Sequence, residues 1–172
     1  DEAERSLREL GFAYLHAPSF HPGMRHVGPV RMELGVKTAF NLIGPLANPA
    51  RPRRQLVGVP TEAAAESVAA ALHELGTERA FVVLGERLDE LPLDGSGVIF
   101  DVGPGGIERR TVSADDHGLA EADTDVLAGG DGEANADLIR RVFDGSETGP
   151  VRDVVALNAG AALLLAGRAD DL

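Results

Sequence analysis

Apolar runs separated by glycine, proline and charged residues predict a regular succession of elements in the middle of the chain. The run at 55–59 predicts a strand, TEAAAESVAAALHELG at 61–76 predicts a helix, and RAFVVL at 79–84 predicts a second strand. Thr61 is expected to cap the helix and Gly76 to end it. Because the connecting loops are short, these elements are expected to form a right-handed βαβ unit with parallel strands.

The rest of the pattern predicts further helices and one antiparallel hairpin. Helices are expected at 1–10, 22–34, 38–42, 134–143 and 151–166, and a short strand at 12–16. Strands at 97–102 and 107–112 flank GPGG, which is typical of a hairpin turn; a phosphate-binding loop would open a helix instead. We therefore predict a single α/β domain with a central, mainly parallel sheet flanked by helices, and an antiparallel hairpin.

The two helices expected near the end of the chain differ in their patterns. The helix at 151–166 is apolar almost throughout, which predicts that it is buried. The helix at 134–143 is amphipathic and has one apolar face, formed by Leu138, Ile139, Val142 and Phe143. Asn158, like Asn41 earlier in the chain, lies among apolar helical residues, where amides usually serve backbone groups. Gly129-Gly130 with Asn135 is expected to form a loop and cap before a helix.

Composition and charge narrow the functional classes. The 172 residues are enough for one domain with a substantial core, and the net charge of −12 would repel nucleic acid and anionic membranes. The basic cluster at 51–54 is expected to be a solvated loop; the alternative is a contact with a phosphate or a partner. The absence of cysteine excludes a disulfide framework and a thiol nucleophile, and it is compatible with the cytoplasm. No signal peptide is visible, and the longest apolar run, 154–166, is too short to span a bilayer.

The segment 17–49 mixes cationic, apolar and turn-forming residues in an unusual way. Arg31 stands among apolar residues, where a charge is costly to bury unless an anion meets it. The alternative is that Arg31 lies on the wet face of a short helix. His21 and His26 are five residues apart, which is not the i, i+4 spacing of a shared metal site. Gly44-Pro45 is expected to form a turn.

Asp89 and Glu90 follow the second predicted strand of the βαβ unit. Ligands of parallel α/β sheets collect beyond the carboxyl ends of the strands, which is where this pair would lie. Adjacent carboxylates repel each other unless a cation screens them, and Mg²⁺ bound to phosphate oxygens is a common solution. The alternative is an exposed acidic turn in an acidic protein.

The order of several motifs resembles the anthranilate phosphoribosyltransferase family. The motifs are Phe12, AP at 17–18, HP at 21–22, VR at 30–31, LG at 34–35, T-x-F-N-x-x-G-P-L-x-N-P at 38–49, LDEL at 88–91, GG at 129–130, NA at 135–136 and LNA at 157–159. Each motif alone is weak, but together they cover almost the whole chain in one register. Lys37 departs from the family, which more often has arginine there, and this puts any bidentate role at 37 in doubt.

The resemblance implies transfer of a phosphoribosyl group from phosphoribosyl pyrophosphate to anthranilate, with release of pyrophosphate. It implies the nucleoside phosphorylase and phosphoribosyltransferase-like C-terminal fold, and a homodimer formed through an N-terminal domain. It assigns anthranilate binding to Arg31, with Gly44, Pro45, His21 and Met24 lining the pocket, and Mg²⁺ binding to Asp89 and Glu90. It assigns no residue to covalent or acid–base catalysis.

Two family motifs, Gly-Thr-Gly-Gly-Asp for the donor phosphates and Lys-His-Gly-Asn, do not occur in this sequence. The resemblance places both upstream of the matched part, together with the N-terminal helical domain. The chain is therefore expected to be truncated at both ends relative to the family, and to be inactive alone. The alternatives are a pyrimidine nucleoside phosphorylase-like transferase and a non-enzymatic module that binds a small ligand.

Overall fold

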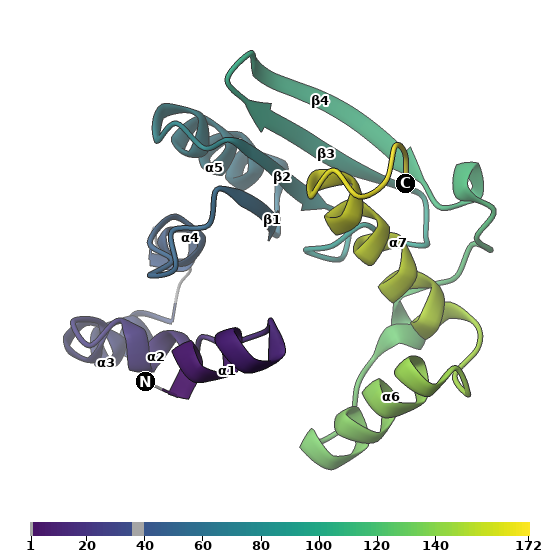
Figure 1. Cartoon of the computed structure of the whole chain (residues 1–172), viewed down its shortest axis with the longest axis horizontal. Helices are drawn as coiled ribbons and strands as arrows, with labels where there is room; N and C mark the ends of the chain where they lie inside the picture. The colour runs from purple at the N-terminus through teal and green to yellow at the C-terminus, as the bar shows by residue number, and fades with distance from the viewer. Residues whose placement is uncertain (1, 36–39) are drawn as a thin grey trace. The chain divides into compact units, whose positions relative to one another are not determined.

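The computed structural model describes residues 2–35 and 40–172, and the chain divides into two compact units, 1–51 and 52–172 (Figure 1). The described part of the first unit is helical. Its helices are α1 (Glu2–Leu10), α2 (Ala17–Phe20), α3 (Met24–Leu34) and α4 (Phe40–Leu46). Gly11 ends α1 with a φ of +71°, a value that glycine adopts without strain.

Two sequence predictions in the first unit are wrong. Residues 12–16 form no strand, because the described residues of this unit include no neighbouring strand that could pair with them. Gly44 and Pro45 lie inside α4 and not in a turn. Pro45 has no N–H to donate within the helix, and α4 ends one residue later, closing with the Ala47 N–H on the Ile43 carbonyl at 2.9 Å.

The second unit is an α/β structure. Its strands are β1 (Arg54–Gly58), β2 (Arg79–Leu84), β3 (Ser96–Gly103) and β4 (Gly106–Ser113). Its helices are α5 (Glu62–Glu74), α6 (Gly132–Asp144) and α7 (Pro150–Leu165), with the 3-10 turns η1 (Asp115–His117) and η2 (Thr124–Leu127). Thr61 caps α5 as predicted, since its Oγ1 accepts from the Ala64 N–H at 3.2 Å.

The described strands form one four-stranded sheet in the order β1-β2-β3-β4. β1 and β2 are parallel and are joined through α5, which confirms the predicted parallel βαβ unit. β2 pairs antiparallel with β3, and β3 pairs antiparallel with β4 in the predicted hairpin. The prediction of a mainly parallel sheet is therefore wrong, and the sheet is mixed. A helix does not cross over between β2 and β3, so the chain returns along β2 in the opposite direction.

Helices cover both faces of the sheet around β2 (Figure 1). Phe81 and Val83 belong to the cluster that includes the buried residues of α7. The alternate residues Ala80 and Val82, also fully buried, point to the opposite face, where α5 packs. This double burial explains why the β2 sequence is continuously apolar.

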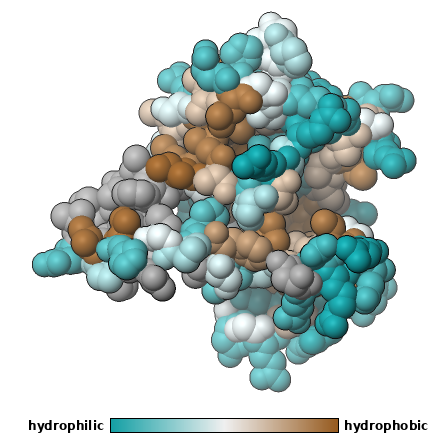
Figure 2. Space-filling model, turned by 60° about the vertical axis from the view of Figure 1, so that its left-hand side comes forward, coloured by the Kyte–Doolittle hydropathy of each residue, from teal (hydrophilic) through white to brown (hydrophobic). Residues whose placement is uncertain are grey.

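The two C-terminal helices bury less surface than their patterns predict. α7 buries one stripe, consisting of Val154, Leu157, Ala161 and Leu165, so the prediction of a buried helix holds for that stripe only. None of the thirteen residues of α6, all of them described, is buried, and Phe143 is 84% exposed. Apolar side chains reach the surface in several places among hydrophilic ones (Figure 2). No helix within the described ranges is both long and apolar enough to cross a membrane.

Candidate functional site

The loop after β2 carries Asp89 and Glu90, the two carboxylates expected to bind a metal. This loop turns back at once, because the Gly85 N–H donates to the Leu88 carbonyl at 2.8 Å. Asp89 then lies against Gly58, the last residue of β1, which pairs in parallel with β2. The pair therefore follows the carboxyl ends of two parallel strands, and the predicted location is confirmed.

The main chain of Asp89 approaches β1 so closely that position 58 has no room for a side chain. A Cβ on Gly58 would lie 1.8 Å from the Asp89 carbonyl oxygen and 3.0 Å from the carbonyl carbon. The φ of Gly58 is not positive, so the close approach and not an unusual backbone conformation requires glycine here. The sequence analysis missed this residue, although a glycine that ends an apolar strand is a known signal of such an approach.

Asn158 on α7 binds the chain just beyond the two carboxylates. Its Oδ1 accepts from the Leu91 N–H at 2.9 Å, and its Nδ2 donates to the Leu91 carbonyl at 2.9 Å. The same Nδ2 donates to the Val154 carbonyl at 3.0 Å. The carboxamide thus pairs with both main-chain groups of Leu91, as a neighbouring strand would. The prediction that Asn158 serves backbone groups is confirmed, and the structure identifies those groups.

The residues after the carboxylates are firmly packed. Leu91 and Leu93 are fully buried in the cluster that includes α7. Pro92 fills the space beside two glycines: a Cβ on Gly85 or on Gly97 would come within 2.9 or 2.7 Å of its ring carbons. Asp89 and Glu90 themselves are exposed. A fixed main chain therefore presents two carboxylates to solvent.

The charges of the pair are not balanced by neighbouring residues. Desolvation by partial burial raises the pKa of Glu90 above its ordinary value, and the negative charge of Asp89 raises it further. Neither carboxylate forms a hydrogen bond or ion pair with any residue whose side chain the structure describes. A cation at this position would relieve the repulsion.

The donor set fits Mg²⁺ in an open site. Mg²⁺ prefers carboxylate oxygens and usually keeps water or substrate phosphate as its remaining ligands. Within the described ranges, no group of three or more histidine, aspartate or glutamate side chains could hold a metal ion by itself. Asp89 and Glu90 would therefore hold the ion from one side only.

The raised pKa of Glu90 predicts a pH-dependent gain in stability for Glu90→Gln. The folded state binds the Glu90 proton more tightly than the unfolded state, so the ionised carboxylate destabilises the fold once the pH exceeds the raised pKa. We expect Glu90→Gln to raise Tm at pH 7, and the gain to shrink as the pH falls through the raised pKa, so that little of it is left below the ordinary glutamate value of 4.5. Thermal unfolding across pH checks this, with Glu86→Gln on the same loop as the control. A pH-independent gain would refute the electrostatic explanation.

The structure describes His21, Gly44 and Pro45, three of the residues assigned to the acceptor pocket, within the unit 1–51. His21 follows α2, and its Nδ1 lies 3.0 Å from the Ala17 carbonyl while its Nε2 lies 3.0 Å from the Ala47 carbonyl. Gly44 and Pro45 are among the last helical residues of α4, just before Ala47. His21 thus joins α2 to the end of α4 through backbone groups. Its predicted contact with anthranilate stays a prediction.

Other predicted residues fall partly or wholly outside what the structure describes. Arg31 and Met24 belong to α3, and Asn41 to α4, but their side chains are outside the described part. Lys37 lies in the undescribed segment 36–39. The roles assigned to these residues therefore stay predictions.

The basic cluster at 51–54 is exposed, as expected, and is also paired. Arg53 and Arg54 each lie 2.8 Å from a carboxylate oxygen of Glu78, just before β2. The hydrogen bond from Arg54, with the charges of both arginines, lowers the pKa of Glu78. The Arg54 guanidinium also donates to the Leu165 carbonyl at 3.3 Å. These contacts join the starts of β1 and β2 to the end of α7.

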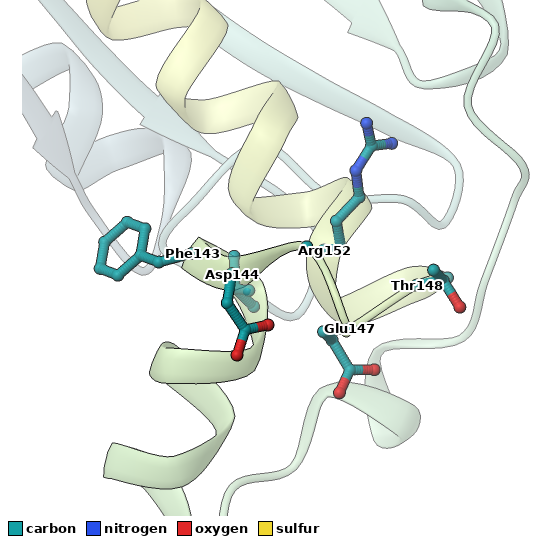
Figure 3. A pocket seen from close by; sticks show the side chains of 8 residues that line it. Phe143, Asp144, Glu147, Thr148 and Arg152 are labelled. Carbon is teal, nitrogen blue, oxygen red and sulfur yellow. The ribbon is translucent and has the colours of Figure 1, made fainter.

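Figure 3 shows a pocket of about 550 Å³ where α6 ends and α7 begins. Phe143, Asp144, Glu147, Thr148 and Arg152 are among its lining residues. Its charged groups already have partners: Glu147 pairs with Arg141 at 3.0 Å, and Arg152 with Asp153 at 2.7 Å. The pocket includes none of the predicted site residues.

The comparisons with known proteins assign this α/β domain to a class of transferase. The family model described as "Glycosyl transferase family, a/b domain" matches residues 1–172. The chain belongs to this family. Its resemblance to anthranilate phosphoribosyltransferases in particular is also confirmed.

Relatives of that name match over nearly the whole chain. The anthranilate phosphoribosyltransferase of Rubrobacter xylanophilus is 46% identical over 173 residues, which is 100% of this chain and 51% of the relative. The crystal structure of the Thermus thermophilus enzyme superposes with a TM-score of 0.91 at 44% identity, covering 99% of this chain and 50% of that one. The chain therefore spans about half the length of the curated relatives it matches.

Two structures of the Saccharomyces cerevisiae anthranilate phosphoribosyltransferase carry ligands. One is in complex with phosphoribosyl pyrophosphate and Mg, and has a TM-score of 0.84 at 28% identity over 91% of this chain and 45% of that chain. The other is in complex with 4-fluoroanthranilate, and has a TM-score of 0.83 at 28% identity over 92% of this chain and 47% of that chain.

Proposed function

We propose that the protein containing this chain is an anthranilate phosphoribosyltransferase of tryptophan biosynthesis. The observation that carries the proposal is the end-to-end similarity, at 46% identity, to a relative of that name, with no large part of the chain left unmatched. The position of Asp89 and Glu90 at the carboxyl ends of β1 and β2 supports it. The ligands of the yeast enzyme support the same substrates and metal for this protein.

In the proposed reaction, the anthranilate amine forms a bond to the anomeric carbon of phosphoribosyl pyrophosphate while the bond from that carbon to pyrophosphate oxygen breaks. Asp89 and Glu90 would hold Mg²⁺, which supplies charge neutralisation for the leaving pyrophosphate. The rigid loop after β2 would fix the position of the metal ion that neutralises the pyrophosphate charge. Arg31 would bind and orient the anthranilate carboxylate through its planar guanidinium. Rate enhancement would come from positioning, without a covalent intermediate.

The acceptor specificity tests the proposal. The full-length protein should consume anthranilate in the presence of phosphoribosyl pyrophosphate and Mg²⁺, with equimolar release of pyrophosphate. The same preparation should not cleave thymidine with inorganic phosphate. Phosphorolysis of thymidine without anthranilate consumption would instead support the nucleoside phosphorylase alternative. Binding of anthranilate without turnover would support a non-enzymatic module.

Arg31→Ala should weaken anthranilate use selectively. Loss of a bidentate, charge-assisted contact is worth about 1.5–3 kcal/mol, so we expect KM for anthranilate to rise by roughly 10- to 100-fold. KM for phosphoribosyl pyrophosphate should change little. Steady-state kinetics with each substrate varied in turn measures both. Arg31→Lys is the matched variant, because it keeps the charge without the planar fork, and it should show an intermediate loss. Unchanged anthranilate affinity in Arg31→Ala would remove Arg31 from the pocket.

A further inference from the structure

We propose that Asn158 is the positioning residue for the Asp89–Glu90 pair: through the main chain of Leu91 it sets the direction in which the two carboxylates meet a divalent cation. This inference rests on the proposed function, in which the pair binds Mg²⁺. Asn158 itself would touch neither metal nor substrate.

The connection from Asn158 to the carboxylates is short and stiff. The Leu91 N–H that Asn158 Oδ1 accepts belongs to the planar peptide whose carbonyl is that of Glu90. Fixing this N–H therefore fixes the orientation of the peptide that carries Glu90. The second bond, from Asn158 Nδ2 to the Leu91 carbonyl, prevents rotation about the first. The third bond, to Val154 on the same helix, fixes the carboxamide on α7.

The main chain of the pair is held from the other side as well. The Asp89 carbonyl lies against Gly58, in the space that a side chain at 58 would occupy. The Asp89–Glu90 backbone is thus confined between the end of β1 and α7, while both side chains remain exposed. Because the two side chains branch from this confined main chain, the restraint sets the directions in which they leave it.

Water cannot readily replace Asn158 at Leu91. Leu91 is fully buried, so removal of the carboxamide leaves a buried N–H and a buried carbonyl without their partner. The main chain would shift to find other partners, and Glu90 would move with it. A shift of this kind lowers metal affinity without removing a ligand, as partners of metal ligands commonly do when they are replaced.

The chain contains a matched control for the hydrogen bonds between Asn158 and the main chain of Leu91. Asn135 on α6 makes the same pair of hydrogen bonds to the main chain of Gly130. Its carboxamide accepts from the Gly130 N–H at 2.8 Å and donates to the Gly130 carbonyl at 3.1 Å. These bonds close the loop before α6, whose N-cap is Asp131, and involve neither carboxylate of the pair. Asn135→Ala therefore removes an equivalent backbone contact without the proposed effect on the metal.

The test measures binding of Mn²⁺, a paramagnetic substitute for Mg²⁺, to the full-length protein. Binding is followed by the loss of the electron paramagnetic resonance signal of free Mn²⁺. Asn158→Ala should weaken Mn²⁺ binding by about tenfold, the lower end of the range for partners of metal ligands. Asn135→Ala should bind Mn²⁺ as the wild type does, and Asp89→Asn should bind it more weakly still. In activity assays, the Mg²⁺ concentration for half-maximal rate should rise in Asn158→Ala, while kcat at saturating Mg²⁺ is largely retained.

Two outcomes would overturn the inference, and they are distinguishable. If Asp89→Asn loses Mn²⁺ but Asn158→Ala binds it normally, Asn158 has only a structural role and the proposed metal site stands. If Asp89→Asn also binds Mn²⁺ normally, the metal role of the pair fails and the inference fails with it. Circular dichroism confirms that each variant is folded. Asn158→Ser, which removes the carboxamide but keeps a small polar group, is measured in the same way if the alanine variant does not fold.

Discussion

Replacement of Asp89 by asparagine in the full-length protein is expected to lower kcat/KM for phosphoribosyl transfer by about a hundredfold or more. A bound metal contributes several kcal/mol of charge stabilisation in reactions of this kind, and each 1.4 kcal/mol corresponds to a factor of ten in rate. The amide keeps the shape of the side chain but removes the charge that would hold the metal. Steady-state rates over a range of Mg²⁺ concentrations measure the loss, part of which excess Mg²⁺ should restore.

The stability of Asp89→Asn separates this effect from misfolding. Because Asp89 raises the pKa of Glu90 through repulsion, removing its charge should leave the fold at least as stable as before. Glu86→Gln on the same loop is the matched control, since it removes one exposed negative charge and should retain activity. Full activity in Asp89→Asn with an unchanged Mg²⁺ requirement would contradict the proposed metal site.

A methyl group at position 58 should damage both the fold and the site. In Gly58→Ala, the new Cβ would lie 1.8 Å from the Asp89 carbonyl oxygen, so one of the two main chains must move by more than about 1.5 Å to reach ordinary contact. We expect a loss of about 1–3 kcal/mol of unfolding free energy, as for other overpacked positions. A displacement of this size at a positioning element can cost about a hundredfold in rate. Chemical denaturation and steady-state kinetics measure the two effects.

Gly105→Ala is the matched control for Gly58→Ala. Gly105 lies in the turn between β3 and β4, where a Cβ would meet nothing within 4 Å, and its φ is not positive. The substitution should therefore be neutral or slightly stabilising, since alanine restricts the unfolded chain. If both variants behaved alike, the close approach of Asp89 to β1 would not constrain the protein.

The elements of the second unit could be predicted well because their signals are local. The strand RAFVVL, the Thr61 cap and the GPGG turn each depend on residues close together in sequence, and the structure confirms all three. The direction of β3 relative to β2 was not predictable in the same way. The loop between β2 and β3 contains no helix, and no short sequence pattern specifies which strand β3 will pair with.

Burial was less predictable than element type. The apolar face of α6 was correctly located, but Ile139 and Phe143 on that face are exposed. A hydrophobic pattern shows which face can be buried, whereas burial itself requires a second surface to pack against it. The expected strand at 12–16 failed for a related reason, since its residues can form a strand only beside a partner.

The sequence by itself determined the family, through motifs spread along the whole chain, and located Asp89 and Glu90 at the end of a parallel strand. It also indicated that Asn158 serves backbone groups. Only the tertiary structure decided which groups those are, because Asn158 and Leu91 are 67 residues apart. The need for glycine at 58 likewise arises from a carbonyl delivered by a distant loop. Local patterns encode helices, strands and their chemistry, but the contacts that restrain the main chain at Asp89 and Leu91 exist only once the chain has folded.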